Sequence, residues 1–193
     1  MGIKLSLLIC TVPSRVHGLL PRLVTEVQRQ LDAMAEHSIE MLYLGDNKMR
    51  SVGRKRNDLL EMAQGDYVCF LDDDDSIEPI YVSRIHAQLD GLADVICFMV
   101  DCAIDGGPAL PVYYRKDFLK NSNLPGHYER LPNHLMVVKR ELALRTKFAD
   151  ISRGEDKDYS MRLKPLLAHE VVIDEVLYHY EFNRVTTETQ KQV

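Results

Sequence analysis

The sequence lacks the two glycine-rich motifs that most often bind phosphates. No Gly-x-Gly-x-x-Gly follows the first apolar segment, and no Gly-x-x-x-x-Gly-Lys-Ser/Thr occurs in the 193 residues. Both motifs let backbone amides approach the phosphates of a nucleotide, so their absence excludes a Rossmann dinucleotide binder and a P-loop enzyme. A phosphate site in this chain must therefore be built from other groups.

Paired cysteines, net positive charge and long apolar runs are also missing. The four cysteines form no Cys-x-x-Cys pair, which argues against a zinc site, and Cys10, Cys69 and Cys97 lie in apolar segments where thiols behave as small hydrophobes. The net charge of −5 argues against nucleic-acid binding. The apolar run 5–10 is too short for a signal peptide or a membrane span, so we expect a cytoplasmic protein without one.

Apolar and amphipathic segments alternate through the first half of the chain. They predict strands at 3–10, 39–44, 67–71 and 94–100, and helices at 20–34, 51–65 and 79–89. This alternation is typical of a parallel sheet with crossover helices, in which ligands bind beyond the carboxyl ends of the strands. The sequence therefore predicts an α/β fold with its site at one edge of the sheet.

The second half is less regular. We expect strands at 112–115, 134–139, 170–173 and 176–182, a short helix at 140–146, and loops at 105–108 and 121–126. Another helix begins near Glu155, and Pro165 must kink or end it.

Four consecutive carboxylates, from Asp72 to Asp75, directly follow the third expected strand. Their repulsion at neutral pH is relieved if water or salt screens them or a hard cation bridges them. A solvated loop that caps the next helix, with Pro79 in its first turn, explains one or two acids but not four after a buried strand. We therefore expect a divalent-metal site here.

A basic segment precedes that strand. It consists of Lys48, Arg50, Arg54, Lys55 and Arg56, at the start of an expected helix. Helix amides and arginine side chains favour an anion there, although the same residues also suit an exposed helix face. A diphosphate would use both features, because Mg²⁺ or Mn²⁺ is commonly held by one or two carboxylates plus substrate phosphates.

Two acids begin the helix near residue 155. Asp156 extends the apolar face of that helix and should look inward, whereas Glu155 should point away as a helix-capping acid. An ionised carboxylate at a helix start can accept a proton from a bound hydroxyl. For Asp156, a structural and a catalytic role both fit at this point.

Taken together, these segments resemble the family-2 glycosyltransferases with the GT-A fold, over residues 3–187. The resemblance is carried by Thr11-Val12-Pro13-Ser14-Arg15, Gly45-Asp46-Asn47, Gly53-Arg54-Lys55-Arg56-Asn57, Ala63-Gln64-Gly65-Asp66-Tyr67, Phe70-Leu71-Asp72-Asp73-Asp74-Asp75, Gly154-Glu155-Asp156 with Arg162-Leu163, and Leu177-Tyr178-His179-Tyr180. It implies a Rossmann-like, mostly parallel central sheet flanked by helices, with a smaller irregular C-terminal part. It also implies a single domain 1–193, with a nucleotide-sugar-binding half (1–100), an acceptor and catalytic-base half (101–187) and a polar tail (188–193).

The resemblance further implies a role for particular residues. The donor-binding residues would be Thr11, Pro13, Arg15, Asp46, Arg56, Asp72 and Asp73. Within this set, Asp46 would bond the base and Arg56 would lie near the base and the diphosphate. Asp74 would hold the metal, with His179 as a further metal or phosphate contact.

For the second half, the resemblance implies that Asp156 is the general base, with Glu155 beside it in the catalytic set. Asn133 and His134, at the start of an expected strand, are the candidate acceptor contacts, although a lone histidine is more often structural. The expected activity is metal-dependent, inverting transfer of a hexosyl group from a UDP-sugar, of the UDP-glucose or UDP-galactose type, to an acceptor hydroxyl. The cofactor would be Mn²⁺ or Mg²⁺. The acceptor is not identified.

The chain departs from the family pattern at its end. Many relatives have Arg after the terminal Tyr-x-Tyr, where this chain has Glu181, with Arg184 a little later. Longer C-terminal extensions are missing, so the acceptor site is either small or supplied by a partner subunit, as in a homo-oligomer.

Other functions fit parts of the pattern. A haloacid-dehalogenase-like phosphatase would use Asp72 and Asp74, but that motif usually follows the first strand and has Thr or Val where Ser76 stands. A nucleotidyltransferase would need a glycine-rich loop after the first strand, and an EF-hand would need Glu in place of Ser83. A subunit that binds a nucleotide sugar without turnover remains the alternative outside enzymes.

Overall fold

A computed structural model describes residues 2–182 of the chain. Ten strands of this part form one sheet, of which eight follow the order β2 (Ile39–Gly45), β1 (Leu5–Thr11), β3 (Tyr67–Asp72), β9 (Val137–Lys139), β5 (Val95–Ile104), β6 (Leu110–Tyr114), β8 (His127–Arg130) and β7 (Ser122–Leu124). The long strand β10 (Glu170–Phe182) runs parallel to β5, and the two-residue β4 (Ser76–Ile77) pairs with β10. The predicted α/β class with a mostly parallel central sheet is confirmed.

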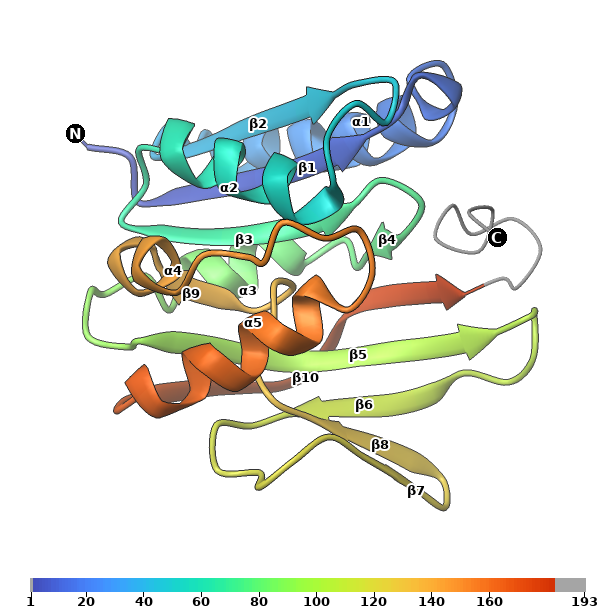
Figure 1. Cartoon of the computed structure of the whole chain (residues 1–193). Coiled ribbons are helices and arrows are strands. Elements are labelled where there is room, and N and C mark those ends of the chain that lie inside the picture. Colours follow the sequence, from blue (N-terminus) through green and yellow to red (C-terminus); the bar gives the residue numbers. More distant parts are fainter. Residues whose placement is uncertain (1, 183–193) are drawn as a thin grey trace.

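Helices cover both faces of the sheet (Figure 1). On one face lie α1 (Leu19–Met34) and α3 (Tyr81–His86), joined through Gln30, which donates to Glu78 O at 2.9 Å and accepts from Val82 N at 2.9 Å. On the other face lie α2 (Val52–Met62), α4 (Arg140–Thr146) and α5 (Glu155–Leu163). A 3-10 turn, Lys164–Leu166, follows α5, as expected from Pro165.

Three parallel strands end at one edge of the sheet. In the register of β1, Thr11 pairs with Gly45 of β2 and Cys10 pairs with Asp72 of β3. Strand β3 is buried on both faces until Asp72, which suits its unbroken apolar sequence. The carboxyl ends of the first three strands therefore bring their polar residues together, as the sequence predicts.

The structure corrects several expected elements. Between β3 and β5 lies β9, antiparallel to both, and it is shorter than the expected strand 134–139 because residues 133–136 form a turn in which Met136 N donates to Asn133 O at 3.2 Å. Helix α3 begins at Tyr81 and ends at His86, because Glu78 N first donates to Leu177 O of β10 at 2.9 Å. The two expected strands at the C-terminal end form the single strand β10, with register shifts between Ile173 and Tyr178.

The expected loop 121–126 is the hairpin of β7 and β8. The segment has little strand character of its own, and its order comes from pairing β8 with β6. Residues 183–187, including Arg184, and the expected tail 188–193 lie outside the described residues. Within residues 2–182, no helix combines the length and apolar character needed to cross a bilayer.

Candidate active site

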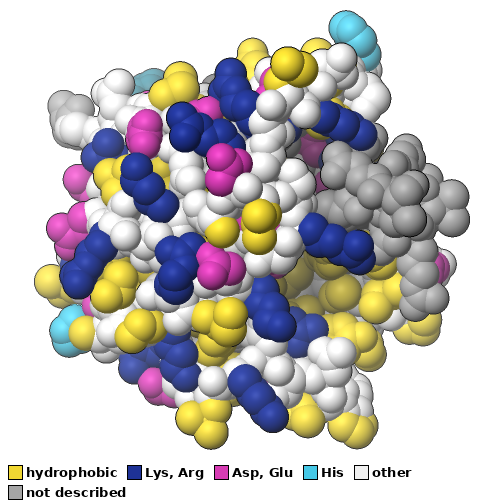
Figure 2. Space-filling view, in the orientation of Figure 1, with side chains coloured by type: hydrophobic (Ala, Val, Ile, Leu, Met, Phe, Trp, Pro, Cys, Tyr) yellow, Lys and Arg dark blue, Asp and Glu magenta, His cyan; other side chains and the backbone are white. Residues whose placement is uncertain are grey.

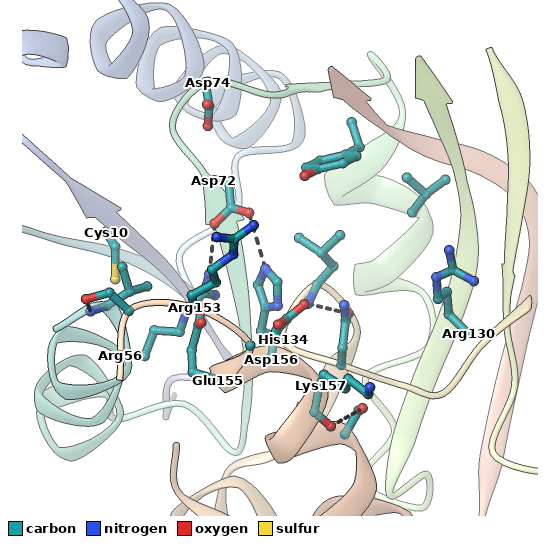
Figure 3. A pocket seen from close by; sticks show the side chains of 18 of the residues that line it. Cys10, Arg56, Asp72, Asp74, Arg130, His134, Arg153, Glu155, Asp156 and Lys157 are labelled. Atoms are coloured by element: carbon teal, nitrogen blue, oxygen red, sulfur yellow. Dashed lines mark hydrogen bonds and ion pairs between the residues drawn. The ribbon is translucent and has the colours of Figure 1, made fainter. Parts of the chain in front are cut away.

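A cavity of about 430 Å³ opens beyond the carboxyl ends of β1 and β3. Its walls come from β1, β3, β5, β6 and β8 and from the starts of α2 and α5 (Figure 3). Pockets that bind small molecules commonly measure about 300–1,000 Å³. In the space-filling view, hydrophobic side chains floor a hollow beside the start of α5, and Lys and Arg side chains border it (Figure 2).

Asp72 lies at the centre of the cavity between a buried arginine and a buried histidine. Its Oδ1 accepts from Arg56 Nη2 at 3.1 Å, and its Oδ2 lies 3.2 Å from His134 Nε2 (Figure 3). Burial alone would raise the pKa of Asp72, but the Arg56 guanidinium and His134 outweigh it and hold that pKa below its ordinary value. Asp72 is therefore a fixed carboxylate.

Arg15 neutralises the next two acids. Its Nη1 donates to Asp73 Oδ1 at 2.5 Å, and its Nη2 donates to Asp74 Oδ2 at 2.7 Å. Asp73 is buried and also accepts from the Thr11 hydroxyl at 2.6 Å. Burial raises the pKa of Asp74, with Arg15 opposing it, and 25% of the Asp74 side chain stays exposed.

Asp75 turns away from the cavity into the core, where it is 1% exposed. It accepts from the Tyr178 hydroxyl at 2.7 Å and from Glu181 N at 3.2 Å. Burial raises the pKa of Asp75 well above its ordinary value, and the charge of Asp72 adds to that effect. We expected water, salt or a metal ion to reduce the repulsion among the four carboxylates, and this expectation is incomplete. Arginines form ion pairs with three of the carboxylates, and the fourth, Asp75, is buried in the core.

Arg56 joins the two halves of the site. It is 4% exposed, with its guanidinium carbon 5.0 Å from the Phe70 ring centre and 5.6 Å from that of Phe148. Its Nε lies 3.6 Å from Glu155 Oε1, and within residues 2–182 neither its Nε nor its Nη1 has a hydrogen-bond partner. A buried guanidinium with unused donors at a cavity wall is suited to bind an anion.

The start of α5 supplies two acids with different surroundings. Glu155 is 6% exposed and faces Arg56, so the expectation that it points away as a capping acid is wrong; the left-handed Gly154 (φ +79°) turns the chain into the helix so that Glu155 meets the guanidinium. Asp156 is half-buried and lines the cavity (Figure 3). Within the described chain, no hydrogen bond or ion pair engages its carboxylate.

The other expected donor residues lie at different distances from the cavity. Thr11 and Arg15 line it, whereas Pro13 is exposed and outside its lining. Asp46 also lies outside the lining, because it accepts from the backbone amides of Lys48 at 3.1 Å and Arg50 at 3.0 Å. It connects to the site through the buried Lys55, whose Nζ lies 3.4 Å from Asp46 Oδ1 and 3.1 Å from Thr11 O.

The two expected acceptor residues both line the cavity. His134 is 8% exposed and engages Asp72 through Nε2, while its Nδ1 has no partner among the described residues. Asn133 accepts from Leu135 N at 3.1 Å, which fixes the turn before β9. His134 therefore orients an acid of the donor side.

His179 lies on β10, outside the residues that line the cavity. Its Nε2 is 2.7 Å from Glu78 Oε1, and its Nδ1 is 4.0 Å from Asp101 Oδ2. These acids, and not Asp74, are its partners.

The residues fit a cation that arrives with a ligand better than a preformed metal cage. Among residues 2–182, no group of three or more His, Cys, Asp or Glu side chains could hold a metal ion. Asp72 and Asp74 are the two partly exposed carboxylates of the acidic loop, with 27% and 25% of their side chains exposed, and Mg²⁺ is often held by one or two carboxylates plus substrate phosphates.

Sequence reasoning missed the cavity residues that the second half contributes. They include Tyr114, Tyr128, Arg130, Arg153 and Lys157. Tyr114 lies on β6, part of which was expected as a strand, whereas Tyr128 and Arg130 reach the cavity through the pairing of β8 with β6, and β8 has no local sequence signal. Arg153 and Lys157 flank the Glu155-Asp156 pair, and that neighbourhood was the one available clue.

A family model described as "Glycosyl transferase family 2" matches residues 24–147, more than half of the chain. This chain belongs to glycosyl transferase family 2. The match spans α2, the acidic loop of β3 and the hairpin of β7 and β8, and it ends before Glu155 and Asp156. A search of curated proteins found no match.

Solved structures of Staphylococcus aureus TarS share the fold of this family 2 chain. TarS 1–349 superposes with a TM-score of 0.63 at 17% identity, over 93% of this chain and 60% of TarS 1–349. Its complex with UDP-GlcNAc gives 0.63 at 15% identity over 93% and 58%, and its complex with UDP gives 0.63 at 16% over 94% and 61%. This chain thus spans about 60% of the length of those TarS chains.

Proposed function

We propose that this family 2 chain is an inverting glycosyltransferase that moves a hexosyl group from a UDP-sugar to an acceptor hydroxyl. One observation carries the proposal: an unengaged carboxylate, Asp156, lines the same cavity as the acids 72–74 and the buried Arg56. The fold shared with TarS, solved with UDP-GlcNAc and with UDP, supports a UDP-type donor. The sugar itself and the expected cytoplasmic location remain predictions.

The donor would lie against the ends of β1 and β3. Arg56, which lines the cavity beside Asp72, would bring its positive charge close to the diphosphate, and Thr11 and Arg15 would border the nucleotide. Asp72, held by Arg56 and His134, is a fixed acceptor for a sugar or ribose hydroxyl. This arrangement binds a diphosphate without a glycine-rich loop.

Asp74 would hold Mn²⁺ or Mg²⁺ together with the diphosphate. Such an ion supplies neutralisation of the charge that develops on a departing diphosphate. Arg15 already pairs with Asp74 at 2.7 Å, so this acid would exchange part of that ion pair for the cation.

Asp156 would act as the general base. The acceptor hydroxyl oxygen forms a bond to the anomeric carbon, the bond from that carbon to the diphosphate oxygen breaks, and its electron pair leaves with the UDP. The hydroxyl proton moves to Asp156, whose carboxylate carries no competing partner in the described chain. Attack opposite to the leaving group inverts the anomeric centre, through an oxocarbenium-like transition state of the kind known for glycosidases.

A test compares three forms of the protein with UDP-glucose, UDP-galactose and UDP-GlcNAc, by measuring UDP release with Mn²⁺ or Mg²⁺ present. Asp156→Asn should lower turnover by about 10²–10⁴-fold, the usual contribution of a general base, while UDP still binds by calorimetry. The matched control is Asp158→Asn, two residues after Asp156, which removes a partly exposed carboxylate that is paired with Arg162.

Equal turnover in the wild type and Asp156→Asn would contradict the assigned base. UDP binding without turnover of any donor would instead indicate a nucleotide-sugar-binding subunit. Asp74→Ala should weaken metal-dependent UDP binding, and unchanged metal dependence would remove Asp74 from the site.

A further inference from the structure

Arg130, at the end of β8, is anchored without being neutralised. Its Nη1 donates to Ser122 O and to Glu129 O at 2.8 Å each, and its Nη2 donates to Asn123 Oδ1 at 2.8 Å. Its guanidinium carbon lies 5.0 Å from the centre of the Tyr128 ring. All of these partners are neutral, and within residues 2–182 no carboxylate forms an ion pair with it.

Two other arginines of the cavity wall are in a different situation, whereas Arg153, on the loop before α5, also lines the cavity without an ion-pair partner among the described residues. Arg15 is paired with Asp73 and Asp74, and Arg56 is paired with Asp72 and Glu155. Their charges are largely balanced before any ligand binds. Arg130 keeps its full charge at a cavity wall, where a partly desolvated cation is unfavourable unless an anion joins it.

A second cation faces the same part of the cavity. Lys157 follows Asp156 on α5, is exposed, and forms no ion pair with a described residue. Figure 3 shows Lys157 on the α5 side of the cavity and Arg130 on the β8 side. Asp156 is the acid without an ion-pair partner among the cavity residues described, so positive charge exceeds negative charge at this end.

The floor between these cations is apolar and aromatic. It includes Val100, Val112 and Leu131 with the rings of Tyr114, Tyr128 and Tyr180. Arg130 is close enough to this floor to act on it electrostatically. Burial raises the pKa of Tyr114, and the positive charge of Arg130 opposes that rise. Carbon atoms of an acceptor would pack on this floor.

We propose that the acceptor carries an anionic group, a phosphate or a carboxylate, which Arg130 and Lys157 bind while the hydroxyl is presented to Asp156. The inference rests on the proposed function, since it assigns the acceptor of that reaction. A neutral acceptor would leave both cations unmatched. Phosphate and carboxylate both fit the fork geometry of a guanidinium, and a lysine beside it adds a point charge.

The test uses three small probes that differ at one carbon: glycerol 3-phosphate, glycerate and glycerol. Each is titrated by NMR into protein that is saturated with UDP and Mg²⁺, so that the diphosphate site is already filled. The anionic probes should bind at least about tenfold tighter than glycerol, and the tighter of the two identifies the group.

Variants assign that preference to residues. Lys157→Gln should reduce the ratio of anionic to neutral affinity by about three- to tenfold, as one lost charge-assisted hydrogen bond would. Arg130→Gln should reduce it at least as much, but it also releases the β7–β8 hairpin, so Lys157→Gln is the decisive variant. The control is Arg145→Gln, an exposed α4 residue outside the cavity lining, which should keep the wild-type ratio.

Equal affinities for the three probes would overturn the inference, and so would the same ratio in Lys157→Gln and Arg145→Gln. Failure of UDP itself to bind would instead contradict the proposed function. The titration with UDP, done before the probes are added, therefore distinguishes a failure of the proposed function from a failure of the proposed anionic acceptor.

Discussion

The two ends of the cavity treat charge in different ways. At the end formed by β1 and β3, three aspartates are paired with Arg15 and Arg56 at distances of 2.5–3.1 Å. At the end formed by β6 and β8, Arg130 is held by neutral oxygens and Lys157 has no ion-pair partner among the described residues. The first end is built where parallel strands finish, and the second where a hairpin is added to the sheet (Figure 1).

This difference separates stability from recognition. A paired buried charge is part of the fold, because removing one partner leaves the other desolvated and alone. An anchored but unbalanced charge contributes less to the fold than a paired buried charge, through its hydrogen bonds alone, and is available for a ligand. Three comparisons of variants test the arrangement of the cavity, in order of expected effect.

The largest effect is expected for Arg56→Gln. The substitution leaves the carboxylates of Asp72 and Glu155 without their cationic partner at a largely buried site. The free energy of unfolding should therefore fall by about 3–5 kcal/mol in chemical denaturation. Arg130→Gln at the other end removes hydrogen bonds to neutral oxygens only, and it should cost about 1–2 kcal/mol. Equal losses for the two variants would remove the distinction between the ends.

A smaller effect is expected for Gly53→Ala, which acts where the two halves meet. Gly53 N donates to Ile151 O at 3.0 Å, and an added Cβ would lie 1.9 Å from Ala149 O. The loop that leads to Glu155 and Asp156 would have to move away from α2, so we expect a loss of about 1–3 kcal/mol in unfolding together with slower turnover.

The control for that change is Gly2→Ala. Gly2 is exposed outside the helices and strands, and its added Cβ meets nothing within 4 Å, so its stability should stay close to that of the wild type. If Gly53→Ala were as stable and as active as Gly2→Ala, contact between α2 and this loop would not position the base.

The smallest effect concerns the pH dependence of stability at the donor end. The pKa of Asp75 is raised in the fold, so its contribution is fully present below its ordinary pKa near 3.8 and is lost as the pH rises through the folded value. Asp72 has a lowered pKa, so its contribution is present above 3.8 and is lost as the pH falls toward the folded value. Each tenfold difference in proton affinity corresponds to about 1.4 kcal/mol.

Denaturation on both sides of pH 3.8 distinguishes these two carboxylates. Asp75→Asn should gain stability relative to the wild type as the pH rises above 3.8, whereas Asp72→Asn should lose stability relative to the wild type as the pH rises toward 3.8 from below. The same pH slope in both variants would contradict the opposite environments of Asp72 and Asp75.

Much of the donor end could be predicted from sequence, because its signals are local. An apolar run followed by acids marks β3 and Asp72, and Ser51 caps α2 by accepting from Arg54 N at 3.0 Å, close to where the helix was expected to begin. The family resemblance brought Arg56 and Asp156 into one site, and the structure places both at the cavity. The metal role of Asp74 and the catalytic role of Asp156 stay predictions.

The expectations that the structure corrects concern residues whose partners lie far away in the sequence. Glu155 was expected to point away and instead meets Arg56, which lies almost a hundred residues earlier in the chain. His179 was expected near the metal, but its partners are Glu78 and Asp101. The 121–126 segment was expected to be a loop, and pairing with β6 through β8 makes it a hairpin that carries Arg130 to the cavity.

The sequence by itself determined the main strands and helices of the first half, the parallel edge where β1, β2 and β3 end, and the presence of acids at that edge. These features follow from periodicity and from composition within single segments. Only the tertiary structure decided which acids are neutralised, which one enters the core and which cations stay unbalanced. The reason is physical: the charge state and solvation of a side chain are set by neighbours from other segments, and a local pattern does not specify them.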